Sequence, residues 1–429
     1  MTSDPQIRDA SAYVWVWLPN TASPIVCGRL STFDHQLVFN YGRSYLSRSD
    51  AVSLYDKELP LQSGVLPLLS GLSLPNCIRD AAPDAWGRRV LINRLASHRA
   101  PGTQDHELSE LTYLLASGSD RIGALDFQKS STFYRPREPL ETSLEDLSKA
   151  AEQLELGVPL SADLGLALLH GTSLGGARPK VFLQEPYRKW IAKFSSTQDL
   201  YSIVKGEFIA MRLARKVGLE VAHVELTSAL GKDILLVERF DRIRQGDCWH
   251  RLGMVSALTL LELDEMMAAY ASYEQLAQQI RARFAHPKTT LRELFCRIVF
   301  NILCGNTDDH ARNHAAFWDG HQLSLTPAFD ICPQSRSGQE ASQAMLIHGK
   351  DRSSQLVNCL QSASTFLLSR QEAISIINHQ VQTIDEAWGP TCDEAQLSEV
   401  ERAFFWRRQF LNPFAFQNAP EDITPVKMK

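Results

Sequence analysis

The sequence is most informative over residues 305–313, which read Gly305-Asn306-Thr307-Asp308-Asp309-His310-Ala311-Arg312-Asn313. Upstream of this stretch, apolar residues recur at helical spacing over residues 294–303, which predicts a buried helix that the glycine ends. The polar loop is therefore held on a rigid support. Asp308 and Asn313 stand five residues apart in it, whereas the residue five positions after Asp309 is His314.

An aspartate and an asparagine at this spacing are typical of kinase catalytic loops. There the aspartate accepts the proton of the substrate hydroxyl, and the asparagine oxygen binds Mg²⁺. A strand-like run follows and ends in Asp330, a carboxylate that a β-hairpin can return to the same ion. The alternative is an ordinary Asx-rich turn, with Asp330 capping a later turn. His310 and His314 have the i, i+4 spacing of metal ligands, but the sequence offers no third ligand for a transition metal.

A glycine pair lies upstream of a predicted strand, in the stretch Gly171-Thr172-Ser173-Leu174-Gly175-Gly176-Ala177-Arg178-Pro179-Lys180. Adjacent glycines let the backbone approach closely and present N–H groups to anions, as a phosphate-covering loop requires. Lys193 follows in the alternating strand over residues 190–194, and kinases keep their phosphate-contacting lysine on such a strand. Glu207 is a candidate partner of Lys193. The alternatives are a generic glycine turn and a lysine that faces solvent.

Other signals outline the organisation of the chain. Trp86 is expected to pack at the start of a helix, and the spacing Thr142-x-x-Glu145 predicts a capping box at the start of another. In kinase order, the run over residues 235–242 is the last small-lobe strand and the hinge that holds adenine. Strands are predicted over residues 13–18, 37–41, 181–183, 190–194 and 233–240, a helix over 207–217, and a linker over 134–139.

Composition narrows the class of protein. The chain has 429 residues, enough for two or three packed units, and 44% of them are hydrophobic. With 44 Lys+Arg against 49 Asp+Glu the net charge is −5, which gives no basic surface for nucleic acid. The sequence contains no apolar run of membrane-spanning length, and its N-terminus lacks the features of a signal peptide. Its eight cysteines are scattered without any CxxC, so we expect a reduced, cytoplasmic protein.

These motifs together resemble the HipA family, the serine/threonine kinase toxins of bacterial type II toxin–antitoxin modules. The resemblance covers nearly the whole chain, and its combined motifs are specific. It departs from the better-studied toxins over residues 249–257, after the hinge. The segments that carry it are residues 26–30, 59–61, 80–88, 120–125, 172–180, 236–242, 306–313 and 325–330.

The resemblance implies an α+β fold of the two-lobed protein-kinase type. Residues 1–140 would form a β-rich N-terminal subdomain, and residues 141–245 a small-lobe-like part with the phosphate loop and the ATP lysine. Residues 246–429 would form a mostly helical C-terminal lobe with the catalytic loop. The cofactors implied are ATP and Mg²⁺.

The resemblance also implies a role for individual residues. Asp308 would be the catalytic base, with Asn313 and Asp330 as the Mg²⁺ ligands. Ser173 falls where family members carry an autophosphorylated serine. Contacts to ATP are implied for Gly175, Gly176, Ala177, Lys180, Lys193, Glu238, Phe240 and His310.

The implied function is that of a toxin neutralised by a HipB-like helix-turn-helix antitoxin, with DNA bound only through that partner. The implied target is a translation-linked protein, an aminoacyl-tRNA synthetase such as glutamyl-tRNA synthetase. Two other classes stay open. The loop over residues 308–313 also looks like that of phosphoinositide kinases, which leaves a lipid or small-molecule kinase. A non-catalytic co-repressor that binds an antitoxin is the other.

Overall fold

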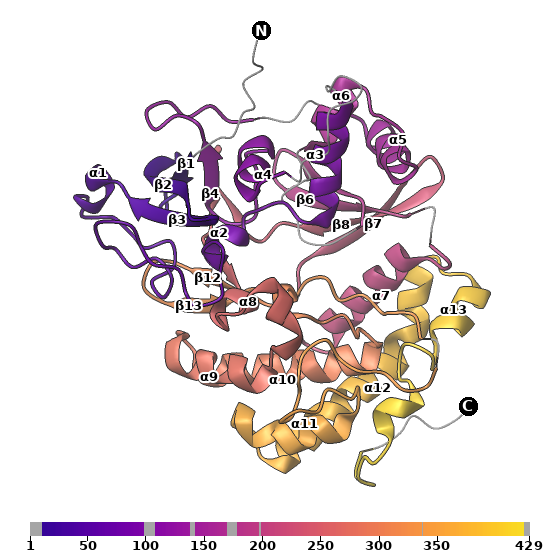
Figure 1. The fold of residues 1–429 in the computed structure, drawn as a ribbon. Helices are drawn as coiled ribbons and strands as arrows, with labels where there is room; N and C mark the ends of the chain where they lie inside the picture. Colours follow the sequence, from indigo (N-terminus) through magenta and orange to yellow (C-terminus); the bar gives the residue numbers. More distant parts are fainter. Residues whose placement is uncertain are drawn as a thin grey trace. The chain divides into compact units, whose positions relative to one another are not determined.

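The structure, a computed structural model, describes residues 11–97, 108–137, 142–169, 178–196, 199–336 and 338–423. The chain forms two compact units, each assembled from segments that are distant in the sequence (Figure 1). The N-terminal unit contains Met1–Ser196, Asp241–Val255 and Trp318–His321. The C-terminal unit contains Thr197–Phe240, Ser256–Phe317 and Gln322–Lys429.

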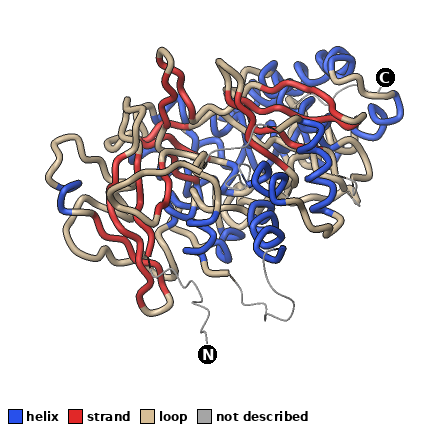
Figure 2. Tube along the Cα trace, turned by 90° about the horizontal axis from the view of Figure 1, so that it is seen from above, coloured by secondary structure: helices blue, strands red, loops and turns tan. Residues whose placement is uncertain are grey.

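A four-stranded antiparallel sheet begins the N-terminal unit, with the strand order β3-β2-β1-β4. The first three strands follow one another along the chain, and β4 joins them from much later in the sequence; Figure 2 shows strands in red and loops in tan. The β-branched and aromatic residues of the first strand favour this conformation and are buried. The strands predicted over residues 13–18 and 37–41 are therefore confirmed, with shifted ends. The four strands are β1 (Ser11–Val16), β2 (Ile25–Phe33), β3 (Gln36–Tyr41) and β4 (Leu125–Gln128).

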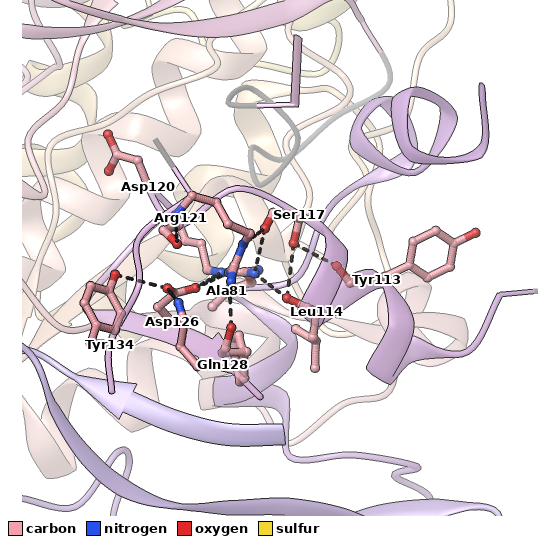
Figure 3. Close-up of polar contacts among 12 residues, drawn as sticks. Ala81, Tyr113, Leu114, Ser117, Asp120, Arg121, Asp126, Gln128 and Tyr134 are labelled. Atoms are coloured by element: carbon pink, nitrogen blue, oxygen red, sulfur yellow. Dashed lines mark hydrogen bonds and ion pairs between the residues drawn. The ribbon is translucent and has the colours of Figure 1, made fainter. Parts of the chain in front are cut away.

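A buried cluster of charged side chains is centred on Asp126 of β4 (Figure 3). Asp126 accepts hydrogen bonds from Arg121 at 3.0 Å and from Arg137 at 2.7 Å. Gln128 and Tyr134 donate to its second oxygen at 2.8 and 3.1 Å. Burial opposes the charge of Asp126, but the two arginines hold the pKa of this carboxyl below its ordinary value. Because both oxygens of the buried carboxylate are paired, removing one of its partners would leave an uncompensated buried charge.

Two late segments of the chain complete the N-terminal unit. The hairpin of β9 (Arg242–Gln245) and β10 (Cys248–Arg251) begins with a buried arginine that contacts Asp120 at 2.8 Å. Trp318 donates from Nε1 to the carbonyl oxygen of Ser53 at 2.8 Å, and its ring meets that of Tyr55 edge-on. The unit therefore depends on residues that follow the last strand of its sheet by more than one hundred positions.

The helices of the N-terminal unit agree with most of the sequence predictions. Trp86 is fully buried in α3 and donates to the carbonyl oxygen of Lys180 at 3.0 Å, as its predicted packing role requires. The predicted capping box is wrong by one residue, because Ser143 rather than Thr142 caps the helix and accepts from Asp146. The helices are α1 (Arg43–Leu46), α2 (Asn76–Arg79), α3 (Ala85–Ser97), α4 (Glu110–Ala116), α5 (Leu144–Glu155) and α6 (Ala162–Leu169).

The C-terminal unit is mostly helical and is built around α10 (Pro287–Cys304). The apolar stripe predicted over residues 294–303 is confirmed, since each of its members is at most 1% exposed. A hairpin of β7 (Val224–Ala229) and β8 (Lys232–Glu238) belongs to the same unit, with α7 (Ile203–Lys216) packed against it. The predicted helix over residues 207–217 therefore exists but begins one turn earlier.

The remaining elements complete the list. No helix within the described ranges has the length and apolar character needed to cross a bilayer. The remaining strands of the N-terminal unit are β5 (Lys180–Gln184) and β6 (Lys189–Phe194). The chain passes between the units at β11 (Met254–Ser256) and β12 (Ala315–Trp318). The C-terminal unit adds α8 (Ala257–Leu260), η1 (Glu265–Tyr270), α9 (Tyr273–Arg283), η2 (Ala311–Asn313), β13 (Leu323–Leu325), α11 (Leu356–Ser362), η3 (Ala363–Phe366), α12 (Arg370–Glu394), α13 (Glu399–Phe405) and η4 (Pro413–Phe416).

Candidate functional site

The loop over residues 305–313 begins where α10 ends in a left-handed glycine. Gly305 has φ 72° and ψ 24°, a conformation that L-residues with a side chain adopt at a cost. A Cβ atom at this position would lie 2.7 Å from the carbonyl oxygen of Gln409. The carbonyl oxygen of Gly305 accepts a hydrogen bond from the N–H of Gln334 at 3.0 Å. The glycine therefore fixes both the start of the loop and the segment that follows Asp330.

Asp309 anchors the loop from inside. It is 3% exposed, and its Oδ2 accepts hydrogen bonds from Asn301 at 2.7 Å and from the Tyr273 hydroxyl. The Nε2 atom of His314 lies 2.9 Å from the same oxygen. Burial opposes the charge of Asp309, but His314 and the hydrogen bonds lower its pKa below the ordinary value. Asp309 is thus an ionised structural carboxylate, and His314 is its partner.

Asp308, the residue before this anchor, is exposed. Partial desolvation is the largest cause that raises the pKa of its carboxyl; His310 opposes the shift, and the charges of Asp330 and Asp309 add to it. A charge effect of this kind requires the carboxylates to lie near one another. Asp308 and Asp330 therefore lie within electrostatic reach of each other.

Asn313 and Asp330 are the two predicted Mg²⁺ ligands, and they lie on either side of the strands β12 and β13. Asn313 is buried in η2, and its Nδ2 donates to the carbonyl oxygen of Asp308 at 3.2 Å. The chain then forms the pair β12 and β13, closed by a hydrogen bond from the Thr326 N–H to the Ala315 carbonyl oxygen at 3.0 Å. Asp330 follows with φ 59°, a left-handed conformation that costs a non-glycine residue about 1 kcal/mol or more.

The donors at this place fit a magnesium ion carried by a nucleotide. The Asp330 carboxylate and the Asn313 amide oxygen are hard ligands, and the nearby charge of Asp308 adds to the negative potential that favours a cation. In the described part of the chain, no group of three or more His, Cys, Asp or Glu residues could hold a metal alone. Mg²⁺ commonly takes only one or two protein carboxylates and completes its shell with phosphate oxygens and water. The donor set therefore suits Mg²⁺ together with ATP.

The predicted hinge lies beside the same group of residues. Glu238 ends β8, where its N–H donates to the carbonyl oxygen of His223 at 2.8 Å. The ring of Phe240 packs against those of Phe317 and Phe329, with centroids 6.0 and 5.5 Å apart. Phe329 directly precedes Asp330. The contact between Phe240 and Phe329 therefore links the hinge to the segment that carries the candidate Mg²⁺ ligand.

The ring of His310 has a buried polar atom that the fold leaves without a hydrogen bond. Its Nδ1 is buried and has no hydrogen-bond partner among the residues that the structure describes. Buried polar atoms of this kind are rare in folded proteins, and a ligand is one explanation. The observation agrees with a contact between His310 and a bound nucleotide.

The predicted phosphate-binding residues belong to the N-terminal unit. Lys180 and Lys193 face each other in the register of β5 and β6. The Lys180 ammonium is 4% exposed and lies 3.2 Å from a carboxylate oxygen of Asp84, so it already has a buried ion pair. Lys193 is half-buried. Four predicted residues lie outside the described ranges, namely Ser173, Gly175, Gly176 and Ala177.

Sequence reasoning missed the residues that hold the loop in place. Tyr273 and Asp309 are 36 positions apart in the sequence. Glu265 and Arg312, which form an ion pair, are 47 positions apart. Pairs at such separations leave no periodic or spacing signal. His314 did have a signal, the spacing to His310, but the structure uses it for a hydrogen bond.

Known proteins share both the sequence and the fold of this chain. The HipA-like C-terminal domain matches residues 172–388, and the HipA N-terminal domain matches residues 16–128. The chain is 30% identical over 203 residues to "Putative kinase Y4mE" of Sinorhizobium fredii, which covers 46% of this chain and 45% of that protein. It is 27% identical over 159 residues to the serine/threonine-protein kinase toxin HipA of Shewanella oneidensis, covering 33% and 36%. The chain thus spans about half the length, or less, of these relatives.

The fold agrees with a solved structure over nearly its full length. HipA of Shewanella oneidensis, determined in complex with HipB and operator DNA, superposes with a TM-score of 0.68. The match covers 93% of this chain and 95% of that one at 19% sequence identity. It confirms the predicted HipA-like α+β fold. Because the C-terminal family model alone matches half of the chain, the protein belongs to the HipA family.

Proposed function

We propose that this protein is an ATP- and Mg²⁺-dependent serine/threonine protein kinase and the toxin of a toxin–antitoxin module. The observation that supports the proposal is the loop after the buried helix α10, in which the Nδ2 of Asn313 donates to the Asp308 carbonyl oxygen and the charge of Asp330 acts on the Asp308 carboxyl. Membership of the HipA family and a named kinase toxin among its relatives support the same class.

In this proposal each residue of the loop has one task. Asp308 accepts the proton of the substrate hydroxyl, and its raised pKa makes it a better acceptor. Asn313 and Asp330 hold Mg²⁺, which when bound with ATP offsets the negative charge on the phosphates during transfer. Asp309 keeps the loop in position without touching the substrate.

The remaining residues bind ATP. Glu238 and Phe240 hold adenine through their backbone, and His310 contacts the nucleotide through its ring. Lys193 contributes a point charge to the phosphates. Lys180, which is paired with Asp84, also contacts ATP. Gly175, Gly176 and Ala177 cover the phosphates, and Ser173 is the site of autophosphorylation.

The proposed partners follow from the family. The solved HipA structure contains HipB and operator DNA, and we propose a HipB-like helix-turn-helix antitoxin for this chain, with DNA bound through it. The proposed target is a translation-linked protein of the cytoplasm, such as an aminoacyl-tRNA synthetase. The net charge of −5 is consistent with indirect binding to DNA.

The test measures ATP binding by calorimetry with and without Mg²⁺, and phosphoryl transfer with labelled ATP. We expect Mg²⁺-dependent binding and transfer, and an Asp308→Asn variant that keeps the first and loses the second by about 10²–10⁴-fold. Asp385→Asn is the matched control, because Asp385 is an exposed aspartate of α12 in the same unit. Transfer at the wild-type rate by Asp308→Asn would reject the base. Absence of ATP binding in the wild type would favour a non-catalytic co-repressor.

A further inference from the structure

A cavity of the C-terminal unit is lined by three cationic side chains of α7. Its volume is about 460 Å³, and the described residues that line it are Arg212, Arg215 and Lys216. Ligand pockets in proteins commonly have volumes of about 300–1,000 Å³. The three residues belong to one helix, and none of them is part of the loop over residues 305–313. This cavity, which we call the α7 pocket, is therefore a candidate site in addition to the one proposed for phosphoryl transfer.

Helical spacing places the three cations on one face of α7. Positions three and four residues apart are neighbours on a helix surface, with Cβ atoms about 5–6 Å apart. The opposite face is packed, since Leu213 and Ala214 are fully buried. The end of the helix is also closed, because the N–H of Leu219 donates to the carbonyl oxygen of Ala214 at 3.0 Å. The backbone that carries the cations is thus held in place before any ligand binds.

The pocket has fewer negative charges than positive ones. Arg212 forms an ion pair with Glu394 of α12, with Nη2 and Oε1 2.6 Å apart, and its Nε has no hydrogen-bond partner among the described residues. Arg215 and Lys216 are exposed, and within the described ranges neither forms an ion pair with a carboxylate. One carboxylate against three cations leaves two positive charges uncompensated.

This arrangement has an energetic cost that an anion would remove. Like charges three and four positions apart repel each other and destabilise a helix. The helix dipole favours cations in the last turn, which accounts for the presence of Arg215 and Lys216 there. It does not offset the repulsion among three cations around one cavity. An anion in the α7 pocket would interact favourably with all three.

We propose that the α7 pocket binds a small ligand that carries a diphosphate group. Two phosphates supply the negative charge that the two uncompensated cations lack. The planar guanidinium of arginine matches phosphate oxygens in a bidentate manner, and lysine adds a point charge. A small molecule is favoured over nucleic acid because the cations surround one cavity of a chain with net charge −5 and do not extend along a surface. The proposal uses no residue of the loop that carries Asp308, so it does not depend on the kinase function.

The experiment titrates the full chain with inorganic pyrophosphate and, separately, with orthophosphate in a calorimeter. The buffer contains EDTA, because the proposed ATP site requires Mg²⁺. The wild type should bind one pyrophosphate per chain, about tenfold or more tightly than orthophosphate. The double variant Arg215→Gln/Lys216→Gln should lose about tenfold or more of the pyrophosphate affinity. Pyrophosphate should also raise the melting temperature of the wild type more than that of this variant.

The matched control is Lys288→Gln/Arg292→Gln, which removes two exposed cations four positions apart from α10 of the same unit. It should bind pyrophosphate as the wild type does. Both double variants should fold, because all four side chains are exposed. Absence of pyrophosphate binding in the wild type, undiminished affinity in the α7 variant, or an equal loss in both double variants would overturn the site. Orthophosphate binding as tight as that of pyrophosphate would overturn the diphosphate ligand.

Discussion

Two adjacent aspartates in the loop have opposite surroundings, although their side chains are identical. Asp309 is buried and surrounded by donors from three elements, while Asp308 is exposed and lies near the charge of Asp330. The buried, hydrogen-bonded carboxylate of Asp309 holds the loop in one conformation. The exposed carboxylate of Asp308, with its raised pKa, is suited to take up a proton. One aspartate thus positions the loop, and the other is the proposed catalytic base.

This separation predicts different results for the same substitution at the two positions. Asp309→Asn removes a buried charge from its partners and places amide hydrogens beside the donors Tyr273 and Asn301, so it should destabilise the protein by about 3 kcal/mol. Asp308→Asn should leave stability within about 0.5 kcal/mol. Urea unfolding followed by tryptophan fluorescence compares the two variants. Equal stability of both would contradict the anchoring role of Asp309.

Asp330 leads to a prediction about the metal. Asp330→Ala should weaken ATP binding in the presence of Mg²⁺ and leave binding in excess EDTA unchanged, because only the metal-bridged contact is lost. Calorimetric titration under both conditions measures the difference. An equal loss with and without Mg²⁺ would show that Asp330 acts on the nucleotide or on folding in another way.

The sequence contained a spacing signal for the proposed site residues but none for the contacts that hold the loop. Asp308, Asn313 and Asp330 were found by their spacing, because a short loop and a hairpin keep them local in the chain. The Tyr273 hydroxyl and the Glu265 carboxylate come from another element, and only the packing of α9 and η1 brings them to the loop. Contacts of this range depend on the tertiary fold and have no local pattern.

At the scale of elements, the end of α10 determines where the loop begins. Gly305→Ala forces a left-handed conformation on alanine and places its Cβ 2.7 Å from the Gln409 carbonyl oxygen. We expect a loss of about 2 kcal/mol or more in stability. Because Gln334 also bonds to this residue, phosphoryl transfer should fall together with the melting temperature. Gly338→Ala, at a glycine with open space around its Cβ, is the control. Unchanged transfer in Gly305→Ala would contradict the positioning role.

The start of α2 leads to a prediction about pH. Glu58 accepts the N–H groups of Asn76 and Cys77, at 3.1 and 2.7 Å, and burial raises its pKa from 4.5 to about 7. The folded state therefore favours the protonated acid. Its contribution to stability is complete below pH 4.5 and is lost as the pH rises through 7, by about 3 kcal/mol at most. Urea midpoints between pH 4.5 and 8 should fall in the wild type and change less in Glu58→Gln. Parallel pH profiles would reject this assignment.

Elements with strong periodicity were predicted well, and their ends were not. The stripe over residues 294–303 places α10 correctly because nearly every turn contributes apolar residues to the core. The start of α5 was misplaced because Thr142 and Ser143 both have an acidic residue three positions later. Local sequence could not choose between them. The structure selects Ser143, the register that buries Leu147 and Leu154.

At the scale of the whole molecule, the proposed toxin should act in the cell through phosphoryl transfer. Expression of the chain alone should slow growth, and Lys193→Ala should relieve the effect, because the proposed phosphate contact loses its charge. Growth curves with equal protein levels provide the measurement. Lys232→Ala, on a strand of the C-terminal unit, serves as a control. Persistent arrest with a folded Lys193→Ala variant would indicate a non-catalytic effect.

The Trp318 side chain imposes an order of events during synthesis. Its contact with Ser53 joins residues 265 positions apart, so the ribosome must add that many residues after the first partner emerges. At about 5–20 residues per second this takes roughly 15 to 50 s. Throughout this interval the N-terminal unit lacks its last segment, and chaperones meet a nascent chain whose first unit is not yet complete. Translation that stops before residue 318 therefore yields a chain with an unfinished first unit, and any activity that needs both units begins only late in synthesis.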